Sequence, residues 1–343
     1  MLSPRVVVAI CLCCTLQASL TNISRGIQEV HNLMTQSSSS PRDFTEVDRR
    51  KLSDIEHQLQ SELQDARHLA AEDVKQLPPI ASHLAMINAL RAGVGNMTQM
   101  VETVCEAAVV HCDALDGNSL FKLTFAAGSL SPCPSHLVET FAWAYSRLSG
   151  QNGKALSDMV LVMAKCNVRN RPLLGRYARS IVEQDHSLTS YDVTNVVDAL
   201  AKLRFADIEL FLQLSQRAIG IMDTFSARDV ARVAGAFATV DIFSFELLHQ
   251  VSHRAIQVMD DMAAWDIAKL ARAFATFNIA DHDLFQHLLD RAAAIADTFK
   301  PHDIAEMKWA LDTLHISVTG CGLFLDLLSG RGAPRGDVFD KRP

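Results

Sequence analysis

Glycine, proline and the largest aromatic residues are scarce in this sequence of 343 residues. It contains 15 Gly, 10 Pro, three Tyr and three Trp, whereas 49% of its residues are hydrophobic. Strand-rich folds need frequent turns and many aromatic or β-branched residues, so this balance argues against a β-barrel or a β-sandwich. The hydrophobic content also argues against wholesale disorder. We therefore expect an all-α protein with a substantial core.

An excess of positive charge is absent as well. The chain has 32 Lys and Arg against 39 Asp and Glu, which gives a net charge of −7. A protein with this balance has no overall basic field that would attract nucleic acid. Any nucleic-acid site must therefore be local.

The sequence patterns of common enzyme and metal sites are missing too. The chain has no phosphate-binding glycine loop and no G-x-S-x-G turn. His249 and His253 have a spacing that suits a metal on a helix, but neither a third ligand nor a catalytic glutamate accompanies them. We expect no catalytic residues, no bound metal and no cofactor, and therefore no enzymatic activity.

The cysteine spacings match neither a known zinc site nor a disulfide framework. Three of the eight lie near the start, and the other five are Cys105, Cys112, Cys133, Cys166 and Cys321. Their spacings do not match a zinc ribbon or a zinc finger. An odd number of scattered cysteines fits reduced thiols in the core better than a set of disulfides.

The first 40 residues differ from the rest, because Arg5 and Arg25 are their only basic residues and Glu29 is their only acid. This composition predicts a targeting leader over residues 1–40. The apolar run VVVAICLCCTL is too short to span a bilayer, so we expect no membrane span in the mature chain. Three destinations stay open: the mitochondrion, which we favour, a plastid reached through a bipartite leader, and the secretory pathway. A chain without a targeting signal is the remaining alternative.

Residues 41–77 are highly charged, with Leu52, Ile55, Leu59 and Leu63 on one helical face. They predict a single amphipathic helix. A capping helix against the first repeat is favoured over a partner-binding coiled coil, because the apolar face covers few heptads. At the other end, residues 330–343 predict a disordered tail.

A spacing of 37 residues dominates the C-terminal half. Four columns keep it: Asp192, Asp229, Asp266 and Asp303; Ala199, Ala236, Ala273 and Ala310; Arg217, Arg254 and Arg291; Asp223, Asp260 and Asp297. A fixed period of this length is typical of a solenoid built from small helical units.

Each unit has the pattern of a helical hairpin. Thr189 with Asp192 predicts a capping box at the start of a first helix, and an apolar residue before the cap predicts a hydrophobic staple. Asp207, Ser244 and Asp281 are placed to cap a second helix. The alanine column suits a close helix crossing.

Weaker copies of the hairpin lie upstream. The stretch ALSDMVLVMAKCNV carries Asp158, which is 34 residues before Asp192, and two more degenerate pairs precede it. We predict a right-handed α-solenoid of about seven helical hairpins, degenerate over residues 78–187 and regular over residues 188–329.

The arginine column borders the apolar face of the second helices. A ladder of guanidinium groups would suit a phosphate chain, but pairing with the Asp223, Asp260 and Asp297 column is the favoured interpretation.

One face of the first helices varies from unit to unit. Positions spaced by four, three and four residues share this face, and they are Tyr191, Asn195, Asp198 and Lys202; Arg228, Arg232, Gly235 and Thr239; Trp265, Lys269, Arg272 and Thr276; His302, Glu306, Trp309 and Thr313. The mixture of aromatic and basic residues is what stacking on unpaired bases with phosphate contacts requires. The candidate RNA-binding residues are therefore Tyr191, Asn195, Lys202, Arg228, Arg232, Trp265, Lys269, Arg272, His302 and Trp309.

Two other interpretations of this face stay open. In one, Trp265 and Trp309 are buried between hairpins and the arginines pair with nearby acids. In the other, the face binds protein. Residues 188–315 hold 11 Lys and Arg against 18 Asp and Glu, which argues against tight non-specific RNA binding.

The repeat carries a family resemblance. KPHDIAEMKWALDTL (300–314) and AWDIAKLARAFATF (264–277) resemble the octotricopeptide and heptatricopeptide repeats and the helical region of FAST-kinase-like proteins. Proteins of this kind are typically organellar RNA-binding factors, and many end in a RAP domain, which is not visible in this chain. Helical-repeat accessory proteins of mitochondrial RNA-editing complexes are similar in general character.

This resemblance implies a non-enzymatic mitochondrial protein that acts in RNA processing, stability, translation or mitoribosome assembly. Its partners would be single-stranded or ribosomal RNA and other proteins of an organellar ribonucleoprotein complex. The alternative is a protein-binding scaffold without direct RNA contact, and a third possibility is a secreted helical-repeat protein.

Overall fold

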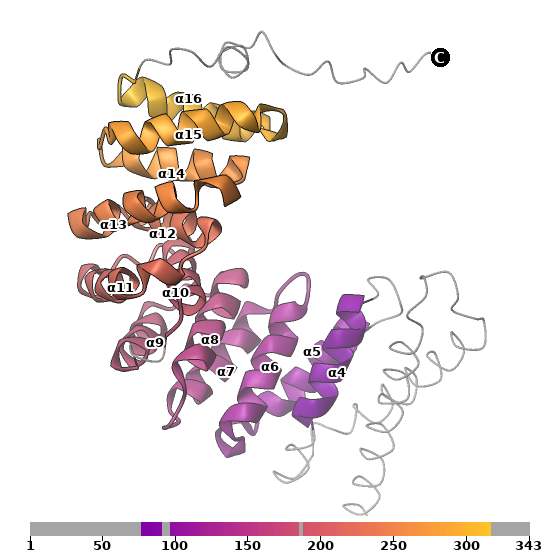
Figure 1. Cartoon of the computed structure of the whole chain (residues 1–343). Coiled ribbons are helices and arrows are strands. Elements are labelled where there is room, and N and C mark those ends of the chain that lie inside the picture. The colour runs from indigo at the N-terminus through magenta and orange to yellow at the C-terminus, as the bar shows by residue number, and fades with distance from the viewer. Residues whose placement is uncertain (1–76, 91–96, 185–187, 317–343) are drawn as a thin grey trace, which may run out of the picture. The chain divides into compact units, whose positions relative to one another are not determined.

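The computed structural model describes residues 77–90, 97–184 and 188–316 of the chain. In this part every regular element is helical, with thirteen α-helices and short 3₁₀ segments (Figure 1). The predicted all-α solenoid is therefore confirmed. None of these helices has the length and apolar character that crossing a bilayer needs. The predicted leader, the tail and all but Leu77 of the charged segment lie outside the described residues.

The chain forms two compact units, residues 1–177 and 178–343, and α9 (Arg171–Glu183) contains the boundary. The other described helices of the first unit are α4 (Leu77–Leu90), α5 (Met97–Val109), α6 (Gly117–Ser129), α7 (Ser135–Ser146) and α8 (Gly153–Lys165). These helices lie in the residue range for which the sequence predicts degenerate hairpins. Helix α6 packs against both α4 and α8, so the first helices of successive hairpins stack on one another.

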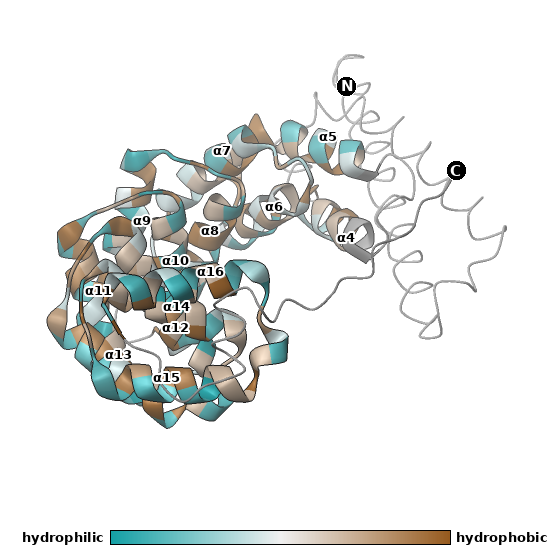
Figure 2. Ribbon diagram, turned by 90° about the horizontal axis from the view of Figure 1, so that it is seen from above, coloured by the Kyte–Doolittle hydropathy of each residue, from teal (hydrophilic) through white to brown (hydrophobic). Residues whose placement is uncertain are grey.

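The regular hairpins make up the second unit. Its helices are α10 (Ser190–Lys202), α11 (Ile208–Gly220), α12 (Ala227–Val240), α13 (Phe245–Gln257), α14 (Ala264–Thr276), α15 (His282–Ala294) and α16 (Pro301–Thr313). The first helices, α10, α12, α14 and α16, form an inner layer, and α11, α13 and α15 lie along an outer arc (Figure 2). The partner that the sequence predicts for α16 lies beyond the described residues.

The first helices begin as their capping residues predict. Thr189 Oγ1 accepts from Asp192 N at 3.3 Å, and Asp192 Oδ2 accepts from Thr189 N at 3.0 Å. The equivalent pair in α12 has the same arrangement. In α16 Pro301 occupies the first turn, and Asp303 alone accepts from Lys300 N at 3.1 Å. Each carboxylate satisfies an amide that the helix leaves free.

Each first helix from α8 onward ends in a residue of left-handed conformation. These residues are Asn167, Arg204, Asp241, Asn278 and His315, with φ between 54° and 56°, and successive ones are 37 positions apart. The next amide closes the helix end, as Phe205 N does by donating to Leu200 O at 2.9 Å. The regular spacing therefore starts one hairpin earlier than predicted. The equivalent of Asp192 in α8 is Ala155, not Asp158.

The alanine column lies where successive first helices meet. Ala199, Ala236, Ala273 and Ala310 are each no more than 1% exposed. Helix α12 packs against α10 and α14, and α14 packs against α16. Small side chains at these positions let neighbouring helix backbones approach closely, as the sequence indicated.

The arginine column does not form the pairs predicted for it. Arg254 Nε donates to Phe225 O at 3.0 Å, and Arg291 Nε donates to Met262 O at 3.2 Å. Arg217 Nη2 donates to Leu188 O at 2.6 Å. Each acceptor belongs to the staple residue before a first helix, so the arginine ties the second helix to the first helix of its own hairpin. Among the described ion pairs, none joins Arg254 to Asp260 or Arg291 to Asp297.

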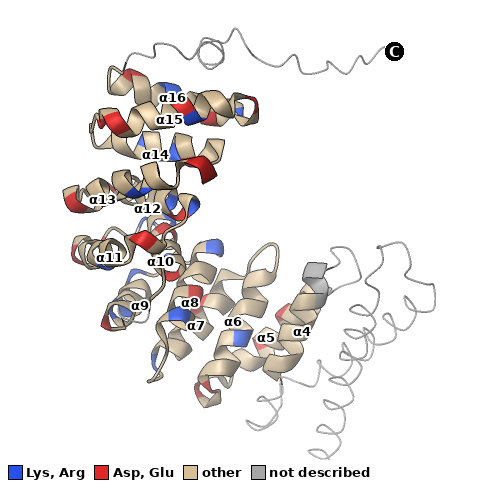
Figure 3. Ribbon diagram, viewed as in Figure 1, with Lys and Arg blue, Asp and Glu red and all other residues tan. Residues whose placement is uncertain are grey.

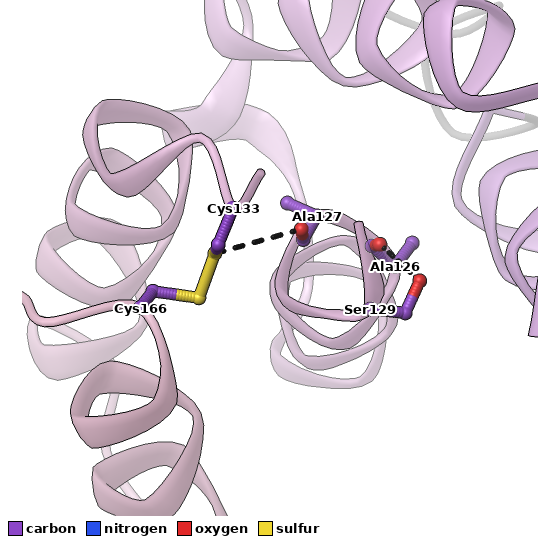
Figure 4. Close-up of a disulfide and its surroundings, with 5 residues drawn as sticks. All are labelled: Ala126, Ala127, Ser129, Cys133 and Cys166. Carbon is purple, nitrogen blue, oxygen red and sulfur yellow. Dashed lines mark hydrogen bonds between the residues drawn. A yellow bond between two sulfur atoms is a disulfide. The ribbon is translucent and has the colours of Figure 1, made fainter. Parts of the chain in front are cut away.

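One pair of cysteines is oxidised. Cys133, in the turn after α6, forms a disulfide with Cys166 at the end of α8, and their Cα atoms are 5.4 Å apart (Figure 4). The prediction of reduced thiols is therefore wrong for this pair. The cysteine count could not show it, because the contact between α6 and α8 brings the two residues together. Cys105 is a free thiol, and burial raises its pKa to about 12.

Reduction of the Cys133–Cys166 bond should destabilise the folded chain. The cysteines are 33 positions apart, and closing a loop of that length removes unfolded-state entropy worth about 3 to 4 kcal/mol. Urea unfolding of the full chain with and without reductant measures this difference. A variant carrying Cys133→Ser and Cys166→Ser should behave like the reduced protein, and a response to reductant that survives in it would contradict the assignment.

Candidate functional site

The predicted face lies on α10, α12, α14 and α16, which pack against one another in that order. We call it the inner row (Tyr191 to Thr313, positions as given above). It carries five Lys or Arg and two acids, a balance of +3. The second helices and their turns, residues 203–225, 240–262 and 277–299, carry four Lys or Arg and eleven acids, a balance of −7 (Figure 3). Positive charge is therefore concentrated on the inner side of an acidic unit.

Asp198 on α10 is the centre of a charge cluster that joins three hairpins. Its Oδ2 lies 2.9 Å from Lys202 Nζ and 2.9 Å from Arg232 Nη2, and its Oδ1 lies 3.9 Å from Lys269 Nζ. Arg232 Nη2 also donates to Asn195 Oδ1 at 3.0 Å. One carboxylate thus faces three cations from α10, α12 and α14, and the cluster keeps an excess of positive charge.

The surroundings of Asp198 keep it ionised. Burial would raise its pKa, but the hydrogen bonds from Lys202 and Arg232 and the charge of Lys269 outweigh burial, so the pKa is lowered. Burial also lowers the pKa of Lys269, and the charges of Lys202 and Arg232 add to this, while Asp198 opposes it. The positive charges of the cluster are therefore partly desolvated and crowded together, a state that an added anion would relieve.

Gly235 on α12 provides the path by which Lys269 reaches Asp198. A Cβ atom built on Gly235 would lie 2.2 Å from Cε and 2.9 Å from Cγ of Lys269. Atoms do not approach that closely, so the lysine side chain lies directly on the glycine. Any other residue at position 235 would displace the ammonium group.

Trp265, at the start of α14, presents its ring to solvent with 37% of the residue exposed. Lys269 Nζ lies 4.6 Å from the ring centroid, and Arg228 Cζ from α12 lies 5.5 Å from it. Both distances suit cation–π contacts. A cation of its own helix and one of the neighbouring α12 therefore contact the indole, while part of its surface stays open.

A second charged group lies between α14 and α16. Arg272 Nη1 donates to Glu306 Oε1, and His302 Nε2 lies 3.4 Å from the same oxygen. Glu306 is only 13% exposed, whereas Arg272 is 57% and His302 73% exposed. The carboxylate therefore positions two polar side chains that remain open to solvent.

A pocket of about 250 Å³ opens on the inner row between these groups. The residues that line it are Gly235, Ala238, Thr239, Trp265, Lys269, Arg272, Ala273, Thr276, His302 and Glu306. Its wall combines an aromatic ring, small side chains and cations. This composition fits a flat aromatic group with an anion beside it.

The structure sorts the predicted RNA-binding residues into three groups. Trp265, Lys269, Arg272 and His302 line the pocket, with Arg228 against the tryptophan ring. Lys202 and Arg232 pair with Asp198, and Asn195 accepts from Arg232. Because Asn195 is buried and the Arg232 side chain is only 16% exposed, these two support the surface rather than form it. Tyr191 and Trp309 are exposed but lie outside the pocket.

The first unit has a comparable surface that the sequence did not indicate. Asn118, Lys122 and Phe125 on α6, and Lys154 and Asp158 on α8, occupy the helix positions that form the inner row in α10. A pocket of about 700 Å³ there is lined partly by Asn118, Lys154 and Asp158. These residues were missed because surface positions were chosen only in the four regular units, and the 34-residue spacing to Asp158 hid the true period of α8. The left-handed turn that begins at Asn167 would have revealed it.

The two histidines with metal-compatible spacing lie on the outer helix α13. The ring centroids of His249 and His253 are 5.6 Å apart. No group of three or more His, Cys, Asp or Glu side chains in the described ranges is placed to hold a metal ion.

Replacing Asp198 with Asn should lower the free energy of unfolding at pH 7 by about 3 kcal/mol, because three cations lose their buried counter-charge. The pKa of Asp198 is lower in the folded chain than in the unfolded one. Its stabilisation is therefore present above the unfolded pKa and is lost as the pH falls through the folded pKa.

The difference in free energy of unfolding between wild type and Asp198→Asn should consequently become smaller below about pH 4. Urea unfolding at a series of acidic and neutral pH values measures it. Asp312→Asn, at an exposed position of α16, is the matched control. A difference that stays constant with pH would show that the charge of Asp198 does not stabilise the fold.

A family model described as RNA-editing substrate-binding complex 6 protein matches residues 55–327, most of the chain. The matched range contains every described helix and the whole inner row. The match agrees with the resemblance to helical-repeat proteins of RNA-editing complexes. It does not confirm the resemblance to the octotricopeptide, heptatricopeptide or FAST-kinase-like families. No curated protein matches the chain.

Proposed function

The chain belongs to the RNA-editing substrate-binding complex 6 protein family, and we propose that it is a helical-repeat subunit of an RNA-editing complex that holds single-stranded RNA against its inner row. The pocket at Trp265 carries this proposal, because a partly exposed indole lies there within cation–π distance of Arg228 and Lys269. Unpaired bases stack on such rings, and phosphates bind the neighbouring cations.

The charge distribution supports this choice of surface. The inner row has a balance of +3, whereas the outer helices and their turns have a balance of −7. Electrostatic attraction to phosphate is therefore local and modest, and the outer side repels RNA. Stacking must supply much of the affinity, which favours single strands over duplexes.

The proposed roles follow from what each side chain already contacts. Trp265 stacks on a base, and Lys269 and Arg228 contact the adjoining phosphates. Arg272 and His302 extend the contact toward α16. Tyr191 and Trp309, exposed near the two ends of the inner row, are placed to stack on bases further along the strand. Asn195 acts by accepting from Arg232, and Arg232 acts by holding Asp198 and, through it, the position of Lys269.

We further propose that the protein is not an enzyme and that it works in the mitochondrion. Recruitment of RNA to an editing complex requires binding and orientation, which a repeat surface supplies without catalytic groups. The predicted leader supports import into an organelle. The runner-up is a scaffold that uses the inner row for protein contacts alone.

Trp265→Ala should weaken the binding of a single-stranded RNA oligonucleotide by roughly 5- to 150-fold, since stacking on one base is worth about 1 to 3 kcal/mol. Lys269→Ala should weaken it less and reduce the salt dependence by about one phosphate contact. Fluorescence anisotropy of the full-length protein at several salt concentrations measures both effects.

Two further variants control this experiment. Lys308→Ala removes an exposed cation of α16 that lies off the inner row and should leave affinity unchanged. Gly235→Ala displaces Lys269 without removing its charge, so it should weaken binding while the fold stays intact. Equal affinities for all variants would place the RNA site elsewhere. If crosslinking in cells recovers partner proteins but no RNA, the result would support the protein-binding scaffold instead of direct RNA binding.

A fluorescent protein fused behind residues 1–45 should enter mitochondria, because this stretch contains the predicted leader. Arg5→Glu together with Arg25→Glu should abolish import, since this change leaves Arg42 as the single Lys or Arg of the fused segment. Microscopy against mitochondrial, plastid and secretory markers measures the result. Accumulation in the secretory pathway without later organelle entry would exclude the mitochondrial proposal.

A further inference from the structure

The outer side of the second unit carries an apolar surface that the inner row does not explain. Ile208 and Leu212 on α11 are 65% and 42% exposed, and Phe245 at the start of α13 is 69% exposed. Phe243, in the turn before α13, is 52% exposed. We call these four residues the outer patch. Single exposed apolar residues are common on proteins, but a cluster of large ones marks an interaction surface.

A hydrogen bond links α11 to the start of α13 beside the patch. Gln216 Nε2 donates to Glu246 Oε2 at 3.4 Å. Leu212 lies one turn before Gln216 on the same face, and Phe245 adjoins Glu246 in the sequence, so both apolar residues lie near this contact. Ile208 extends this row by another turn on α11.

The patch is confined to two hairpins and is not needed by the repeat. At the positions of Ile208 and Phe245, the next hairpin has His282, and at the position of Leu212 it has Gln286. Both replacements are polar and belong to a helix that packs in the same way. The scaffold therefore tolerates polar residues at these sites, and the apolar ones require another explanation.

The charges around the patch define what would cover it. Glu209 and Glu246 are exposed next to Ile208 and Phe245, and the outer helices with their turns have a balance of −7. The guanidinium groups of Arg217 and Arg254 are directed to backbone carbonyls of their own hairpins. A segment that covers the patch must present apolar residues and neutralise carboxylates, so it must be basic and amphipathic.

The other occupants fit less well. Residues 41–77 of this chain have six Lys or Arg against nine acids, so that segment would bring more negative charge to an acidic surface. A second copy that docked through the same patch would also place its Glu209 and Glu246 against the same residues. Both arrangements would be opposed by like charges.

We propose that the outer patch between α11 and α13 is a docking site for a basic amphipathic helix of a partner protein. Apolar side chains of that helix cover Leu212 and Phe245, and its Lys and Arg residues pair with Glu209 and Glu246. The site is on the opposite side of the unit from the inner row. Peptide binding at the outer patch can therefore be tested independently of RNA binding at the inner row.

A synthetic peptide of about five helical turns, with Leu at i, i+4 spacing and Lys or Arg elsewhere, is a direct probe. Fluorescence anisotropy should show that it binds the full-length protein. Leu212→Ser with Phe245→Ser should weaken this binding about tenfold or more, because two large apolar contacts are lost. Glu209→Gln with Glu246→Gln should weaken it less and lower its salt dependence.

Matched controls distinguish specific binding of the peptide from non-specific binding. A peptide with Glu in place of every Lys and Arg, and one with Ser in place of every Leu, should not bind. Met86→Ser replaces a residue of α4 that is 48% exposed and should leave the affinity for the peptide unchanged. The Leu212→Ser, Phe245→Ser variant should keep wild-type circular dichroism and wild-type RNA affinity, since the substituted side chains are exposed.

Three outcomes would overturn the proposal. Equal binding of the basic and acidic peptides would remove the charge argument, and unchanged binding to the double variant would place the peptide elsewhere. A wild-type dimer in sedimentation that the double variant abolishes would make a second copy the occupant. Photo-crosslinking from position 212 that joins only segments of the same chain would make the occupant internal.

Discussion

Successive first helices of the regular unit pack so closely that alanine occupies every crossing. A single hairpin cannot bury its apolar side alone, so each one depends on the hairpin stacked against it. The left-handed residue after each first helix, from Asn167 to His315, reverses the chain in the same way every time. Because the unit repeats without drift, side chains at one helix position line up into continuous rows on its surface.

Those rows give the unit two faces with different chemistry. On the inner row, Lys269 crosses Gly235 to approach Asp198, so one carboxylate orders cations from three hairpins. The same lysine contacts Trp265, which couples the aromatic surface to the charge cluster. On the outer side, acids surround a patch of exposed apolar residues. The two proposed functions, RNA binding on the inner row and partner binding on the outer patch, thus lie on faces of opposite charge.

The sequence predicted local structure correctly where contacts between residues close in the chain determine it. Thr189 with Asp192, Pro301 and the staple residues mark helix starts whichever way the hairpins pack. The 37-residue columns predicted a solenoid because a repeated unit must repeat its contacts. Choosing positions by helical spacing also placed Trp265, Lys269, Arg272 and His302 on one face, and the structure gathers these four around one pocket.

What the residues determined by themselves is therefore the hairpin, its period and the composition of its inner row, since these depend on neighbours along the chain. Only the tertiary structure decided which charges meet. It joined Arg232 to Asn195 and Asp198, turned the arginine column toward backbone carbonyls, and joined Cys133 to Cys166. Each of these contacts links residues about 30 or more positions apart. Their distance in space depends on how hairpins stack, and no local spacing encodes it.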